Sequence, residues 1–300
     1  MPITQQQLTD PQVLAAVSRL EFHSREIVEG FISGLHRSPY HGFSVEFAQH
    51  REYSLGDEIR YIDWKVAARS DRYYVKEFEE ETNLKAQILV DTSASMLYRG
   101  KRATHSKLDY ARILAAALAT LLLRQRDATG LVLFSDGIQR EIPARATGSH
   151  LTQILEELVL AVSPPKSSLG ATFHTLAEQY RRRGVVMIFS DCFDDVEGML
   201  AGLRHFRHRR HELVVFQILD DDELTFPFHE LTKFEGLENE PELLADPRGV
   251  RDAYLAAMTG FGARLESGCR EMKADLVRVN TSELPSDVLS RYLAARSGRR

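Results

Sequence analysis

The chain has 300 residues, of which 43% are hydrophobic and 27% are charged, so it has the composition of a globular protein and enough length for a substantial core. Its formal net charge of -5 gives no support to a nucleic-acid-binding function. The apolar stretch 113–123 is too short to cross a membrane, and the N-terminus lacks the basic-then-apolar pattern of an export signal. We therefore expect a cytoplasmic protein without a membrane anchor, in which Cys192 and Cys269 are buried free thiols.

The N-terminal region, 1–84, is predicted to be a helix followed by a small β-rich segment. Apolar residues recur at three- and four-residue spacing over 8–35, which is typical of a helix, and a stretch containing Pro and Gly ends it. Short runs of aromatic and β-branched residues at 43–47 and 73–78 indicate strands. The pattern changes after this region, so we assign 85–300 to a separate, larger domain.

In the larger domain, predicted strands alternate with predicted helices. Short apolar runs bounded by turn formers indicate buried strands at 86–90, 131–134, 185–189, 213–219 and 276–279. Helices are expected at 106–125, 151–162, 172–183, 196–206 and 251–271 and after the last strand, whereas the acidic segment 220–247 has the pattern of turns and a hairpin. Asp136-Gly137 predicts a tight turn, so 138–144 should pair back as an antiparallel edge strand. The alternation predicts an α/β fold, a doubly wound and mostly parallel sheet with helices on both faces.

Oxygen-bearing side chains gather where the predicted strands end. Ligands of such sheets bind beyond the carboxyl ends of the strands, and the residues found there, or just before a helix, are Asp91, Ser93, Ser95, Thr172 and Asp191. Carboxylate and hydroxyl oxygens suit Mg²⁺, or else Mn²⁺ or Ca²⁺, better than zinc. Gly170 is expected to let the backbone come close to the ligand. The sequence therefore predicts a divalent metal site with one position left for a carboxylate from another protein.

Each of these loops taken alone also fits a simpler role. Ser, Thr and Asp are the favoured residues at helix N-caps, so a single loop of this kind can be a capping cluster. The pair Ser135-Asp136 resembles Ser190-Asp191, but it lies in the predicted hairpin turn and is assigned a structural role. Three loops that carry oxygen donors together favour the metal site.

The same residues carry a resemblance to a known family. Asp91-x-Ser93-x-Ser95, followed by Thr172 and Asp191, resembles the metal-ion-dependent adhesion site of von Willebrand factor A domains, and the resemblance covers about 85–280. It implies that the serines and the threonine contact the metal directly or through water. It also implies that the aspartates act largely through water and that an acidic side chain of a partner completes the shell.

The region before residue 85 resembles one particular family of proteins. Its motif residues are Glu46-Phe47, Arg51-Glu52-Tyr53, Gly56-Asp57, Arg60, Ile62-Asp63-Trp64, Ala68-Arg69, Val75-Lys76 and Phe78. They resemble the hallmark region of the domain-of-unknown-function fifty-eight family, in which this region precedes a von Willebrand factor A-like domain. Genes of that family often lie beside those of MoxR-type AAA+ ATPases, which implies such an ATPase, or its substrate, as the partner. The residues leave open whether Asp57, Asp63, Trp64 and Arg69 form a structural cluster or a partner surface.

We therefore predict a metal-dependent protein-interaction module rather than an enzyme, with no role in binding nucleic acid or membranes. The sequence contains no nucleophile elbow, phosphate loop or dinucleotide fingerprint, and Ser93 interrupts the Asp-x-Asp pattern of aspartyl phosphatases. Two alternatives remain open. One is a Mg²⁺-dependent, phosphatase-like hydrolase that uses the metal as a Lewis acid, and the other is a structural domain with a vestigial metal site.

Overall fold

The larger unit of the chain is built around one six-stranded sheet with the order β10-β7-β6-β3-β4-β5. Its strands are β3 (Lys85–Asp91), β4 (Ala128–Phe134), β5 (Ile138–Arg145), β6 (Val185–Ser190), β7 (Glu212–Leu219) and β10 (Asp275–Asn280). All neighbouring strands run parallel except β5, which pairs antiparallel to β4 at one edge. The predicted fold is therefore confirmed, including the hairpin that the Asp136-Gly137 turn indicated.

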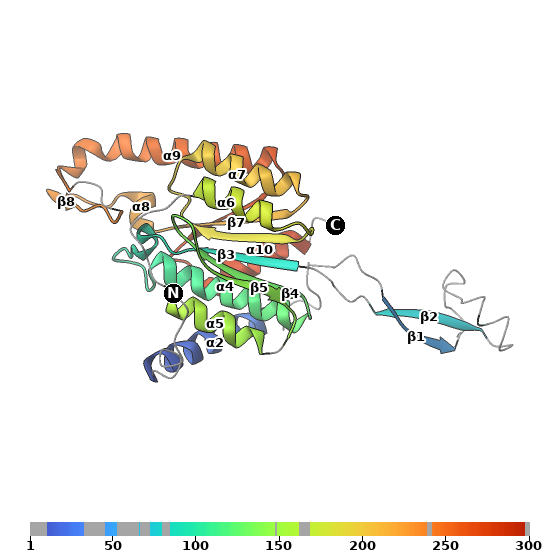
Figure 1. Ribbon diagram of the computed structural model, residues 1–300. Coiled ribbons are helices and arrows are strands. Elements are labelled where there is room, and N and C mark those ends of the chain that lie inside the picture. Colours follow the sequence, from blue (N-terminus) through green and yellow to red (C-terminus); the bar gives the residue numbers. More distant parts are fainter. Residues whose placement is uncertain are drawn as a thin grey trace. The chain divides into compact units, whose positions relative to one another are not determined.

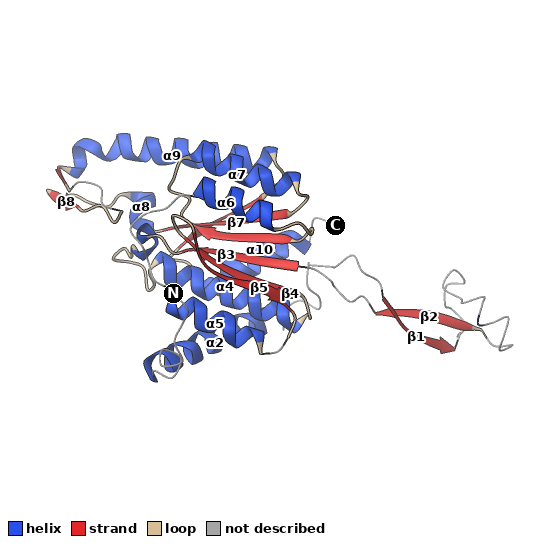
Figure 2. Cartoon of the chain, in the orientation of Figure 1, coloured by secondary structure: helices blue, strands red, loops and turns tan. Residues whose placement is uncertain are grey.

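Helices cover both faces of this sheet (Figure 1, Figure 2). One face carries α2 (Pro11–Ile32), α4 (Lys107–Arg124), α5 (His150–Leu160) and α10 (Pro285–Ser297). The other carries α6 (Leu169–Gln179), α7 (Val196–His208) and α9 (Pro247–Glu271). Because helices exclude water from both faces, β6 is buried along its whole length, and this explains its uninterrupted apolar sequence.

The computed structural model describes residues 11–32, 46–52, 66, 73–79, 85–147, 149–161, 169–238 and 242–297. The chain separates into two units, one formed by 1–39 together with 85–300 and the other by 40–84. This division differs from the predicted boundary, which grouped the N-terminal helix with the β-rich segment. The helix belongs with the larger unit because Val17, Leu20 and Val28 are buried and Ser24 Oγ lies 3.1 Å from Thr120 Oγ1 of α4.

The smaller unit contains an antiparallel pair of strands, β1 (Glu46–Glu52) and β2 (Tyr74–Glu79), with an irregularity in register between Phe47 and Gln49. The first of these strands shares 46–47 with the prediction and continues to Glu52, and the start of the predicted strand at 43–45 lies outside the described residues. The second strand matches the prediction within one residue. The residues whose role the sequence left open, Asp57, Asp63, Trp64 and Arg69, lie outside the described residues.

Short elements follow the strands at the carboxyl end of the sheet. They are η2 (Ala94–Leu97), α8 (Asp221–Thr225), and the small antiparallel pair β8 (Thr232–Phe234) and β9 (Leu243–Ala245). The last two correspond to the hairpin expected within 220–247. Cys192 and Cys269 are free and buried in the core between the sheet and α7, which confirms that prediction. No helix in the described part of the chain is long and apolar enough to cross a membrane.

Candidate metal centre

The carboxyl ends of two neighbouring strands bring the first carboxylates together. Asp91 is the last residue of β3, and Asp191 directly follows β6. The two strands pair in parallel with Val90 beside Phe189, so the residues that follow lie side by side at the same edge of the sheet. The structure thus joins two loops that are 100 positions apart in sequence, as the parallel sheet predicted.

Asp91 is a buried carboxylate held by neutral donors. It is 1% exposed, the Ser190 hydroxyl donates to Oδ2 at 2.6 Å, and the Ser93 amide donates to Oδ1 at 2.9 Å. Burial, and then the negative charge of Asp191, raise the pKa of Asp91 to about 7. Among the residues that the structure describes, no Lys, Arg or His forms an ion pair with Asp91. A cation at this position would therefore relieve an electrostatic cost.

The two predicted serines follow Asp91 on one short turn. Ser93 is the N-cap of η2 and Ser95 lies in its first turn, and their hydroxyls lie 3.1 Å apart. Ser93 is buried, whereas Ser95 is partly exposed, so this hydroxyl lies where the centre meets solvent. Thr92, which lies between Asp91 and Ser93, instead donates its hydroxyl to the carbonyl of Phe134 at 3.0 Å and ties the loop to β4.

Helix α6 begins at Leu169, three residues before the predicted start at Thr172, so Thr172 lies within the first turn of the helix. The Leu169 amide donates to Asp194 Oδ2 at 2.6 Å, which ties the start of α6 to the loop that carries Asp191. Thr172 is 3% exposed, and its hydroxyl has no hydrogen-bond partner among the residues that the structure describes. Because a buried hydroxyl without a partner is costly, binding of a ligand to this oxygen would be favourable.

Gly170 lies at a close contact between two helices. A Cβ atom at this position would lie 2.8 Å from the backbone carbonyl carbon of Gly198, so only glycine lets α6 pack so closely on α7. This packing role was not predicted from the sequence, and the predicted approach to a ligand stays a prediction.

Asp191 has a partner that the sequence analysis missed. The Lys107 ammonium, whose side chain is 1% exposed, donates to Asp191 Oδ2 at 2.9 Å and to Glu223 Oε1 at 2.6 Å. It also lies 4.9 Å from the centre of the Phe193 ring. Burial alone would lower the pKa of Lys107, but the charges of Asp191 and Glu223 outweigh it and raise that pKa. Lys107 therefore stays charged.

A signal for this lysine was present in the sequence. Lys107 is the first residue of α4, directly after the N-cap Ser106. The positive end of the helix dipole disfavours a cation at such a position. A lysine there, followed by a helix that is buried almost throughout, indicates an anionic partner from elsewhere in the chain. What the sequence could not show is which carboxylates these are.

The sequence model of the family described as "Protein of unknown function DUF58" matches residues 49–263, which is more than half of the chain. The chain belongs to the DUF58 family. It is similar to the uncharacterized proteins Rv1480 of Mycobacterium tuberculosis (strain ATCC 25618 / H37Rv) and Mb1516 of Mycobacterium bovis. Each is 26% identical over 294 residues, which cover 96% of this chain and 91% of the relative.

Several solved structures are similar to this DUF58 chain, including the two that follow. Conserved hypothetical protein BatB from Bacteroides thetaiotaomicron aligns with a TM-score of 0.48 and 14% identity, covering 72% of this chain and 99% of that chain. The SpRpn10 VWA domain aligns with a TM-score of 0.40 and 13% identity, covering 69% of this chain and 93% of that chain.

The donors of this DUF58 protein fit a hard divalent cation. No group of three or more His, Cys, Asp or Glu side chains in the described residues is arranged to hold a metal, so hydroxyls and water must supply part of any shell here. Asp91 and Asp191 provide carboxylates, Ser93 and Ser95 provide hydroxyls, and the unpartnered oxygen of Thr172 provides another. Such a set suits Mg²⁺, which commonly keeps several waters.

Proposed function

We propose that this protein is a metal-dependent interaction module in which a divalent cation captures an acidic side chain of a partner protein. The cation, Mg²⁺ in first place and Mn²⁺ or Ca²⁺ as alternatives, would be held by Asp91, Ser93, Ser95, Thr172 and Asp191. The observation that carries the proposal is the buried pair Asp91 and Asp191, at an edge where Ser95 is partly exposed. Thr172, whose buried hydroxyl has no partner among the described residues, lies on the helix whose first amide is bonded to the Asp191 loop.

The hydrogen bonds of Asp191 support capture of an outside carboxylate. Its Oδ1 accepts from the Phe193 amide at 3.0 Å and its Oδ2 accepts from Lys107. Both oxygens are thus partly engaged by the protein, which suits an aspartate that acts on the metal through water. A metal ion that has few direct carboxylate ligands from its own protein binds a carboxylate from a partner more strongly.

Apolar side chains beside the centre would add contact area. Leu97, two residues after Ser95, is 50% exposed, and Leu224, next to Glu223, is 41% exposed. The Tyr98 hydroxyl donates to Asp222 Oδ2 at 3.3 Å, so the segments that carry these two leucines are tied together. An apolar contact next to a charged contact is a common arrangement at protein interfaces.

The resemblance stated above suggests the partner. We propose a MoxR-type AAA+ ATPase, or a substrate that it remodels, as the protein that supplies the acidic side chain, in chaperone-like or assembly work in the cytoplasm. The metal has a binding role in this proposal and catalyses no reaction.

A binding experiment with the full chain tests the proposal. Capture of a MoxR-type ATPase from the same genome should occur in Mg²⁺, be lost in EDTA and return when Mg²⁺ is restored. Asp91→Asn should abolish capture, whereas Asp136→Asn, at an exposed aspartate in the β4–β5 turn, should leave it unchanged. Equal capture in Mg²⁺ and EDTA would show that the metal does not mediate the interaction.

A further inference from the structure

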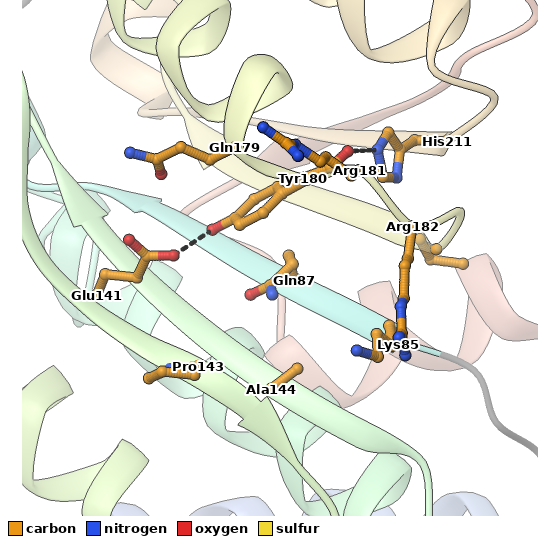
Figure 3. A pocket seen from close by; sticks show the side chains of 12 residues that line it. Lys85, Gln87, Glu141, Pro143, Ala144, Gln179, Tyr180, Arg181, Arg182 and His211 are labelled. Atoms are coloured by element: carbon orange, nitrogen blue, oxygen red, sulfur yellow. Dashed lines mark hydrogen bonds between the residues drawn. The ribbon is translucent and has the colours of Figure 1, made fainter.

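A second site candidate lies at the opposite end of the sheet. A cavity of about 460 Å³ is lined by the starts of β3 and β6, by β5, and by the end of α6 with the loop that follows it (Figure 3). Lys85 begins β3 and Asp91 ends it, so the strand, roughly 20 Å long, separates the cavity from the metal centre. No contact described above for the metal centre involves this cavity.

The lining of the cavity carries an excess of positive charge. Lys85, Arg181 and Arg182 line it, and none of them forms an ion pair within the part of the chain that the structure describes. The next residue, Arg183, does have a carboxylate, since it lies 3.5 Å from Glu212. Against these three cations stands one carboxylate, Glu141, in a chain whose formal net charge is -5. Unpaired cations on one wall repel each other and favour an anion between them.

Backbone packing brings two of these cations to the same end of the cavity. A side chain at Gly184 would lie 2.2 Å from the carbonyl oxygen of Lys85, so the loop that carries Arg182 runs directly against the start of β3. Figure 3 shows the Arg182 side chain reaching from that loop toward Lys85. A guanidinium fork beside an ammonium group is a common arrangement for binding a phosphoryl group.

One wall is fixed by internal hydrogen bonds. The Tyr180 hydroxyl donates to Glu141 at 3.3 Å, so the loop after α6 is bonded to β5 across the cavity (Figure 3). The carbonyl of Tyr180 lies 2.9 Å from His211 Nε2, and burial lowers the pKa of His211, so this ring is neutral at pH 7 and accounts for none of the positive charge. The Tyr180 ring therefore forms an ordered surface for the body of a ligand.

We propose that this cavity binds a small organic phosphate. The phosphoryl group would lie between Lys85 and Arg182, and the body of the molecule would lie against Tyr180. The volume lies within the roughly 300–1,000 Å³ that small-molecule sites occupy. The site is independent of the proposed metal centre and of its partner.

Calorimetric titration of the full chain in EDTA tests this assignment. The probes are adenosine monophosphate, ribose 5-phosphate and inorganic phosphate. We expect at least one organic phosphate to bind more tightly than inorganic phosphate. Because a charge-assisted hydrogen bond contributes about 1.5–3 kcal/mol, Lys85→Gln and Arg182→Gln should each weaken binding about tenfold or more. Arg183→Gln, at the neighbouring arginine that already has a carboxylate, should leave affinity within about twofold.

A further variant tests whether the cavity binds phosphate through specific hydrogen bonds or through positive charge alone. Arg182→Lys keeps the charge but loses the fork, so its affinity should fall between those of wild type and Arg182→Gln. Thermal unfolding checks that each variant is folded. The proposal is overturned if no probe binds at about 10 mM. It is equally overturned if Arg183→Gln weakens binding as much as Arg182→Gln, or if inorganic phosphate binds as tightly as the organic phosphates.

Discussion

Two groups of buried carboxylates lie at the carboxyl end of the same sheet, and they differ in their donors. Asp220, directly after β7, accepts from the Gly100 amide at 3.0 Å, the Thr281 hydroxyl at 2.8 Å and the Asp222 amide at 3.0 Å. Asp222 in turn accepts from Tyr98 at 3.3 Å. These neutral donors fasten the loop after η2 to the end of β7, so the acidic group after β7 holds the structure together.

Asp91 and Asp191 form the contrasting group. They lie close enough for the charge of Asp191 to raise the pKa of Asp91. Ser93 and Ser95 follow Asp91, and the hydroxyl of Thr172 on α6 has no partner among the described residues. A count of acidic residues would rank the segment after β7 first, because it has four in succession. A structural cluster therefore differs from a candidate site in whether each buried acceptor has its hydrogen-bond donors, and not in the number of carboxylates.

Replacing Lys107 tests the link between the two groups and should have the largest effect. Lys107→Met leaves Asp191 and Glu223 buried without their cation, which should lower the free energy of unfolding by about 3–5 kcal/mol in EDTA. Mg²⁺ should restore part of this loss, because the metal supplies positive charge beside Asp191. Urea denaturation with and without Mg²⁺ measures both effects.

The double variant Lys107→Met with Glu223→Gln is the matched control. It removes one charge of each sign and should lose less stability than Lys107→Met alone. A loss below about 1 kcal/mol in the single variant would mean that the ammonium group does not stabilise the pair.

Metal binding should distinguish the two groups directly. At about 100 times its dissociation constant, Mg²⁺ should add about 2.7 kcal/mol to the stability of wild type. Asp91→Asn should abolish this gain. Asp220→Asn should lower stability by about 1–3 kcal/mol, because it disturbs three buried hydrogen bonds, and yet keep the gain from Mg²⁺. Thermal or urea unfolding measures the stabilisation by Mg²⁺ in each variant. If both variants lost this stabilisation, the two groups would not differ in metal binding.

The dependence of stability on pH offers a metal-free test. The folded pKa of Asp91, about 7, lies above the ordinary value of 3.8, so the fold favours the protonated carboxyl. In EDTA, the stability that Asp91 contributes should therefore be present at low pH and fall as pH rises toward 7, by at most about 1.4 kcal/mol per pH unit. The difference between wild type and Asp91→Asn, measured by urea denaturation across this range, isolates the group. A constant difference would contradict the assigned pKa.

Most of the sheet could be predicted because its signals are local. Strands covered by helices on both faces are uninterrupted apolar runs, and β3, β6 and β7 begin and end within one residue of their predicted limits. The start of α9 at Pro247 was missed, although Asp246 before a proline is an N-cap signal that the sequence contains. The start of α6 could not be seen locally, because Asp194, 25 positions downstream, accepts from its first amide.

The candidate site also contains features that depend on local sequence and features that depend on contacts between distant segments. The spacing of Asp91, Ser93 and Ser95 follows from one turn after one strand, so it was visible in the sequence. Lys107 pairs with Asp191, 84 positions away, and with Glu223, 116 positions away. The residues next to Lys107 in the sequence do not indicate which carboxylates it will bind. The missing partner of the Thr172 hydroxyl is likewise a property of packing, which only the folded chain reveals.

That hydroxyl allows a prediction in which a single change has effects of opposite sign. Thr172→Val keeps the shape of the side chain and removes a buried oxygen that has no partner, so in EDTA stability should stay the same or rise by up to about 1 kcal/mol. In Mg²⁺ the same variant should lose part of the stabilisation, because one ligand oxygen is gone. Thr175→Val, on the same helix but exposed and bonded to the carbonyl of Ala171, is the control and should leave the effect of Mg²⁺ unchanged. If Thr172→Val instead destabilises the metal-free protein and leaves the Mg²⁺ effect intact, the hydroxyl supports the fold through a contact other than the metal, and the centre consists of the two strand-end loops alone.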